Sequence, residues 1–152
     1  MKLLIAITAS ILSISTWAQG FRLHDNHLET ICPIRKVWVP VERHVTDFKS
    51  LKNGVAYRAH GNLYFFDRRT GRNRFIEKRV TSYETSNKNQ IVYVHDRDLY
   101  IISQPSKHKA VRLKGNITSY QFSANGVLGF IDDGDLYLRT TCQKGLIKRI
   151  KG

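Results

Sequence analysis

The chain repeats a short pattern three times at a nearly constant spacing. A polar residue and a Leu-Tyr pair occur at Asn62-Leu63-Tyr64, Asp98-Leu99-Tyr100 and Asp135-Leu136-Tyr137, which places the three tyrosines 36 and 37 residues apart. Short apolar runs flank a turn signal before each pair, as is typical of strands joined in hairpins. No segment carries a helical stripe of useful length. The repeat therefore predicts an all-β chain.

Each unit is expected to hold four strands. It opens with a β-branched pair, a small polar residue and an aromatic, at 45–48, 80–83 and 117–120, and a turn signal, a second strand, the Leu-Tyr strand and a fourth strand follow. We predict three full units of about 36 residues, at 45–79, 80–116 and 117–152. Residues 19–44 are expected to form a partial N-terminal unit. Pro40 cannot donate a ladder hydrogen bond, so its strand should lie at a sheet edge or carry a bulge.

The third unit carries the features of a known repeat. It has a hydrophobic-Thr start at Ile117-Thr118, Phe122-Ser123 before an Asn125-Gly126 turn, an apolar strand at 128–131, and Asp135-Leu136-Tyr137. It resembles the TolB-like and WD40-like β-propeller repeat. It departs where the family has Ser-Pro-Asp-Gly, and the first unit lacks the Phe-Ser pair. The resemblance implies a small β-propeller-like array of four-stranded antiparallel sheets. It implies no catalytic residue, because such repeats carry no catalytic motif.

Three full units are too few for a closed propeller, which leaves several architectures open. The partial unit could complete a four-bladed ring within one chain, locked by a disulfide between Cys32 and Cys142, as in hemopexin-like propellers. Alternatively, a homodimer could share one larger ring. An open twisted sheet or another small repeat fold is the third possibility.

The first 18 residues are expected to be a Sec signal peptide. Lys2 is followed by an apolar run, and Thr16-Trp17-Ala18 places small residues at the cleavage positions. We therefore expect a periplasmic or secreted protein without a transmembrane span, the alternative being a retained N-terminal anchor. In an oxidising compartment, Cys32 and Cys142 predict one disulfide, and two free thiols are the alternative.

The composition is strongly basic, with 25 Lys and Arg, 12 Asp and Glu, and a formal net charge of +13. Such an excess favours polyanionic partners, and we expect lipopolysaccharide or an acidic glycan rather than nucleic acid. Basic residues gather after the Leu-Tyr strand of each unit. The candidate binding residues of this kind are Arg68, Arg69, Arg72, Lys107, Lys109, Lys144 and Lys148. The alternative is that these charged residues prevent the exposed outer strands from pairing with other chains.

Equivalent turn positions of the three units hold His60, His95 and Asp132. These side chains are expected to share one rim, as a binding surface or simply as turn residues. The acidic run at 132–135 lacks the later ligands of an EF-hand loop, and the six histidines form no zinc pattern. No Gly-x-Ser-x-Gly motif is present.

We therefore expect no metal, cofactor or catalytic residue. The function expected is a non-enzymatic module that binds a partner protein or an anionic envelope polymer. A structural homodimer and, less favoured, a glycan-acting enzyme are the alternatives.

Overall fold

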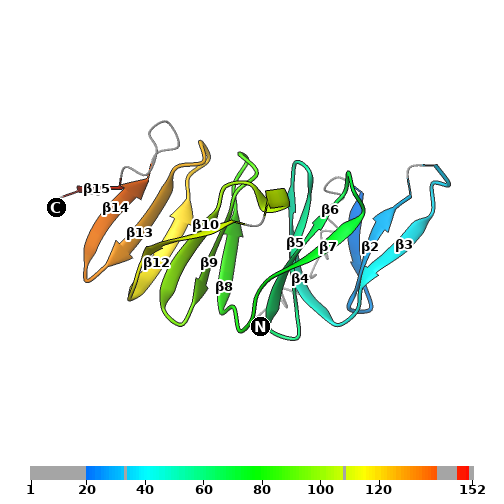
Figure 1. Cartoon of the computed structure of the whole chain (residues 1–152), viewed down its shortest axis with the longest axis horizontal. Coiled ribbons are helices and arrows are strands. Elements are labelled where there is room, and N and C mark those ends of the chain that lie inside the picture. The colour runs from blue at the N-terminus through cyan, green and yellow to red at the C-terminus, as the bar shows by residue number, and fades with distance from the viewer. Residues whose placement is uncertain (1–19, 33, 108, 140–146, 151–152) are drawn as a thin grey trace, which may run out of the picture.

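The computed structural model describes residues 20–32, 34–107, 109–139 and 147–150, the last of these by backbone only. Four antiparallel sheets stand side by side in chain order (Figure 1). The first sheet consists of β1 (Phe21–His24), β2 (His27–Ile31) and β3 (Trp38–Glu42). The second consists of β4 (Val45–Leu51), β5 (Gly54–Ala59), β6 (Asn62–Asp67) and β7 (Arg72–Glu77).

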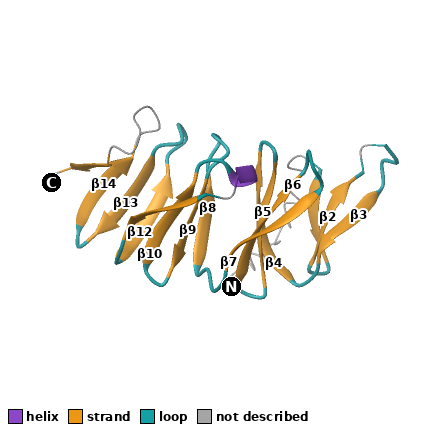
Figure 2. Ribbon diagram, in the orientation of Figure 1, coloured by secondary structure: helices purple, strands orange, loops and turns teal. Residues whose placement is uncertain are grey.

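The third and fourth sheets repeat the four-stranded pattern. The third contains β8 (Ser82–Thr85), β9 (Ile91–His95), β10 (Asp98–Ile102) and β11 (Ala110–Lys114), with a short 3-10 helix, η1 (Pro105–Lys107), before β11. The fourth contains β12 (Ile117–Phe122), β13 (Leu128–Asp132), β14 (Asp135–Arg139) and β15 (Ile147–Ile150). Strands dominate the described part of the chain (Figure 2). The expected all-β, propeller-like array of repeated sheets is confirmed.

The tight turns that join the two middle strands have one geometry in all the full sheets and also join β1 to β2. Both central residues of each turn have positive φ, which is the requirement of a type I′ hairpin. The pairs are Asp25-Asn26, His60-Gly61, Asp96-Arg97 and Asp133-Gly134. The β1–β2 hairpin therefore corresponds to β5–β6, and within the described residues the first sheet has no counterpart of the innermost strand β4.

The threonine near the start of each full unit has a structural role that its sequence position did not reveal. Thr46, Thr81 and Thr118 each direct a hydroxyl to a backbone oxygen of the adjoining strand, at 3.3 to 3.4 Å. In the second and fourth sheets the register also shifts at this point, which marks a β-bulge. The preceding residue donates its N–H to the previous sheet's tight turn, as Val80 does to the Gly61 oxygen at 3.0 Å. The unit opening thus ties neighbouring sheets together.

Aromatic pairs fill the spaces between the sheets. Stacked rings with centroids 5.3 Å apart occur at equivalent positions of the three full sheets: Tyr57 with Tyr64, Tyr93 with Tyr100, and Phe130 with Tyr137. One buried cluster lies at each of the three junctions between sheets. Burial also raises the pKa of the Tyr93 hydroxyl. The aromatics that recur at fixed positions of the repeat are therefore part of the packing between sheets.

Pro40, which has no backbone N–H, lies in an edge strand. Its strand, β3, is the edge strand of the first sheet, and the register against β2 shifts between Leu28 and Glu29, opposite Pro40. The missing N–H therefore interrupts no central ladder. Both features expected from the sequence are present.

The row of sheets is open within the described residues. The first sheet stands at one end and the fourth at the other, so one chain does not close the ring that was one of the expected alternatives (Figure 1). Cys32 forms no disulfide with another described residue. Cys142 lies outside the described residues, and the strands that flank it belong to the sheet at the opposite end. The disulfide stays a prediction, and so does the signal peptide, which also lies outside the described residues.

Candidate functional site

The strands run up and down, so every connection falls on one of two rims. The tight turns lie on one rim together with the sheet-to-sheet connections, and this is called the turn rim. The turns after the innermost strands lie on the other rim with the connections to the outermost strands. Figure 1 shows the two rims as the lower and upper edges of the row. The residues expected to bind are therefore divided between two separate surfaces.

The turn rim carries His60, His95 and Asp132, but each of these makes contacts within its own neighbourhood. The His60 ring is 4.9 Å from the ring of His44. His95 Nε2 lies 3.2 Å from the Asp96 carboxylate. Asp132 is only 6% exposed and lies 3.1 Å from Lys114 Nζ, and this hydrogen bond raises the pKa of Lys114. The three residues share a rim, as expected, but the structure does not bring them together into one site. The expected equivalence of their positions is wrong for His60, which is the first residue of its tight turn, whereas His95 and Asp132 are the last residues of β9 and β13.

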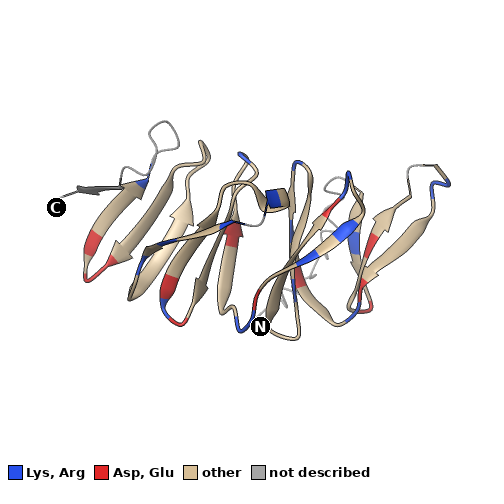
Figure 3. Cartoon of the chain, viewed as in Figure 1, with Lys and Arg blue, Asp and Glu red and all other residues tan. Residues whose placement is uncertain are grey.

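The opposite rim is uniformly basic. The described connections on it contain no Asp or Glu and hold eight exposed cations, and this surface is called the basic rim. Its members are Arg35, Lys36, Lys52, Arg68, Arg69, Lys88, Lys107 and Lys109. The turn rim, in contrast, mixes acidic and basic residues (Figure 3). A surface of one sign raises the local concentration of anions.

Local structure holds the basic rim in place. Asp67 is buried at the end of β6 and accepts the N–H of Arg69 at 2.9 Å, so its carboxylate closes the turn. The Arg68 guanidinium lies 5.0 Å from the centroid of the Phe21 ring in the first sheet, a cation–π distance that joins two sheets. Such packing limits the conformational entropy that Arg68 would lose on binding an anion.

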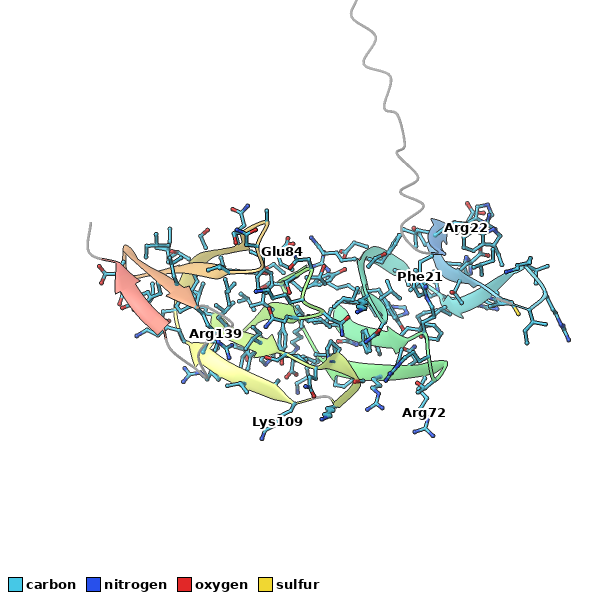
Figure 4. The ribbon with its side chains drawn as sticks, turned by 90° about the horizontal axis from the view of Figure 1, so that it is seen from above. Phe21, Arg22, Arg72, Glu84, Lys109 and Arg139 are labelled. Atoms are coloured by element: carbon cyan, nitrogen blue, oxygen red, sulfur yellow. The ribbon has the colours of Figure 1, made fainter. Side chains whose placement is uncertain are left out.

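Four members of the basic rim were missed from the sequence. Arg35, Lys36, Lys52 and Lys88 are far apart in the chain and lie outside the connections that were considered. The signal that could have found them is topological, because alternate connections of an antiparallel sheet return to the same rim. Of the residues that were expected, Arg72 begins outermost strand β7 and lies with Lys109 along one long edge, opposite Glu84 (Figure 4). Lys144 lies outside the described residues, and of Lys148 only the backbone is described.

A cleft between innermost strands β8 and β12 is a second candidate surface. It encloses about 930 Å³ and is lined by polar groups, including Ser82, Glu84 and Tyr120. The Tyr120 hydroxyl donates to Ser82 Oγ at 2.8 Å, and Glu84 lies 2.8 Å from Lys49 Nζ. The described lining contains no histidine or cysteine. The cleft offers hydrogen bonds to a polar ligand.

The described residues contain no group of three or more His, Cys, Asp or Glu that could hold a metal ion. In the same part of the chain, no helix is long and apolar enough to cross a membrane.

Comparison with solved structures shows the class of fold. The chain matches the N-terminal domain of Nup159 with a TM-score of 0.54 and 13% identity, covering 88% of this chain and 43% of that one. It matches virginiamycin B lyase from Staphylococcus aureus with a TM-score of 0.51, 12% identity, and coverages of 84% and 49%. A structure from S. cerevisiae of Dbp5 bound to Nup159, Gle1, IP6 and ADP matches with a TM-score of 0.53, 13% identity, and coverages of 86% and 42%.

These neighbours are β-propeller proteins, so the sheets of this chain are propeller blades in architecture. At this level of identity the likeness shows the fold alone. The chain spans less than half the length of each of these three matched chains. No family model matches the sequence, and no curated protein matches it.

Proposed function

We propose that this protein is a non-catalytic binding module, exported to the periplasm or secreted, that holds an anionic envelope polymer against its basic rim. The single observation that carries the proposal is the segregation of charge: eight exposed cations and no carboxylate occupy the described connections of one rim. Guanidinium and ammonium groups at close spacing bind sulfate and phosphate groups by charge-assisted hydrogen bonds. The TolB-like resemblance supports a scaffold of blades but names no ligand.

The arrangement favours an extended polymer over a small ligand. The cations come from three different sheets and follow the rim along the row (Figure 3). A linear polyanion can meet many such residues in succession. Binding of this kind depends on the number of contacts and weakens as salt is added.

Two variants of equal charge test the proposal. The rim variant carries Arg68→Gln, Arg69→Gln, Lys107→Gln and Lys109→Gln. The control variant changes four exposed cations of the turn rim, with Arg43→Gln, Lys78→Gln, Arg79→Gln and Arg97→Gln. Affinity for a labelled heparin oligosaccharide should fall at least about tenfold more in the rim variant than in the control. Equal losses would mean that net charge alone, and not the basic rim, attracts the polymer.

A second candidate function is structural: two copies complete one larger propeller, and the dimer is the functional unit. The observations that favour it are the coverage of 42 to 49% of the three propeller chains compared above and the open ends of the row. The mass of the protein in solution tests this candidate, since a monomer at all concentrations would exclude it.

A further inference from the structure

Among the described residues, no sheet covers one apolar face of the last sheet. Gly129, Ile131, Leu136 and Leu138 lie on the side that points away from the third sheet, and this surface is called the end face. Leu136 is 40% exposed, whereas its repeat equivalents Leu63 and Leu99 are 0% exposed. With neighbouring residues of β12, the end face lines a groove of about 510 Å³. The same repeat position is thus core in two sheets and surface in the last.

In the interior of the row, the cover at this position is always the next sheet. Leu63 packs in one cluster with Tyr93 of the third sheet. Leu99 packs in another with Phe130 of the fourth sheet. The end face therefore continues a series of interfaces already present in the chain, and what fits it is the opposite face of another such sheet.

The first sheet presents that opposite face at the other end of the row. Arg22, Glu29, Ile31 and Trp38 lie on it, turned away from the second sheet, and this surface is called the head face. Figure 4 shows Arg22 at the end of the molecule opposite Arg139. The Arg22 guanidinium lies 4.3 Å from the Trp38 ring centroid, and its Nε is 2.6 Å from the Glu29 carboxylate. The Glu29 carboxylate neutralises the positive charge of Arg22. Ile31, on the same face, is 38% exposed.

We propose that the end face of one copy docks on the head face of a second copy, and the reverse, so that two chains close one ring. The inference rests on the second candidate function and names the surfaces that it requires. A head-to-tail contact repeated by a twofold rotation gives a closed dimer, with each copy contributing one end face and one head face. Within the described residues the first sheet has three strands and none in the innermost position. Each junction therefore joins the end face to three strands and leaves the inner part of the groove open to the central channel of the ring.

Three variants test the pairing. Leu136→Arg places a charge on the end face, and Ile31→Arg places one on the head face. Val111→Arg is the control, because Val111 is an apolar residue of β11 with 45% exposure and lies on neither face. Circular dichroism melting of each variant establishes that it folds. Mass is then measured by analytical ultracentrifugation over a concentration series.

The wild type and the control are expected to be dimers. The dissociation constant of the dimer should be at least about tenfold higher for each face variant than for the wild type. A mixture of Leu136→Arg and Ile31→Arg chains should form a 1:1 dimer, because it retains one unaltered junction. A dimer that Leu136→Arg breaks but Ile31→Arg leaves intact would overturn this pairing of faces while keeping the two-copy ring. A wild-type monomer at all concentrations would overturn both.

Discussion

Leu99 and Leu136 occupy the same position of the repeat but differ in what covers them. Leu99 is fully buried between the third and fourth sheets, and Leu136 is 40% exposed on the end face. Substitution of each by alanine therefore measures the free energy that a neighbouring sheet contributes at this position. Leu99→Ala should destabilise the protein strongly and Leu136→Ala only weakly.

The magnitudes follow from the burial. Leucine to alanine removes three carbon atoms, worth about 2.4 kcal/mol when they are fully buried. A closed cavity adds to this cost, so Leu99→Ala should lower the free energy of unfolding by about 3 to 5 kcal/mol. At Leu136 the loss scales with the buried fraction and no closed cavity remains, so about 1.4 kcal/mol is expected in a single chain.

Urea denaturation followed by circular dichroism measures both changes, at protein concentrations where sedimentation shows a monomer. If a second copy covers Leu136, the loss in free energy of unfolding caused by Leu136→Ala should increase as the protein concentration rises. Equal losses for the two variants in the monomer would refute the reasoning, because they would mean that Leu136 is covered within its own chain.

Two further predictions concern the second sheet. Burial by itself would raise the pKa of Asp47, but hydrogen bonds from Arg58 and then Tyr83 outweigh it and lower that pKa below its ordinary value of 3.8. The stabilisation is therefore present above pH 3.8 and is lost as the pH falls through the lowered pKa. The melting temperature of Asp47→Asn should consequently change less with pH across that acidic window than the melting temperature of the wild type. A Cβ at Gly54 would lie 2.0 Å from the backbone oxygen of Phe66, so Gly54→Ala should cost at least about 2 kcal/mol by urea denaturation. Gly129→Ala, whose nearest contact is an ordinary 3.4 Å, is the control, and an equal cost would contradict this account of Gly54.

Much of the fold could be predicted because each unit repeats a turn signal and aromatic residues at the same positions. A turn signal precedes each Leu-Tyr pair in the sequence, and the structure has a tight turn with positive φ at both central residues there, as at Asp133-Gly134. Tyr64, Tyr100 and Tyr137 recur at a fixed spacing in the sequence, and in the structure each ring stacks on an aromatic of the neighbouring strand. Such features depend on local chemistry and on pairing within one unit.

Features that depend on how sheets are placed relative to one another could not be predicted. The openness of the row depends on whether the first sheet meets the last, and no residue pattern within a unit encodes this. Likewise, Lys52 and Lys88 join Arg68 on one rim only because strand direction alternates. Asp132 seemed available for a ligand in the sequence, yet burial and Lys114 give it a structural partner.

The measurement that tests the basic rim most directly is the salt dependence of binding to a heparin oligosaccharide. Affinity falls as salt is added, and each lost ionic contact makes the slope of log affinity against log salt less steep by about 0.7 to 0.9. Four rim substitutions should therefore reduce the magnitude of the slope by about 3. The control variant of the turn rim should keep the wild-type slope. If both variants give the same slope, the basic rim is not the surface that holds the polymer.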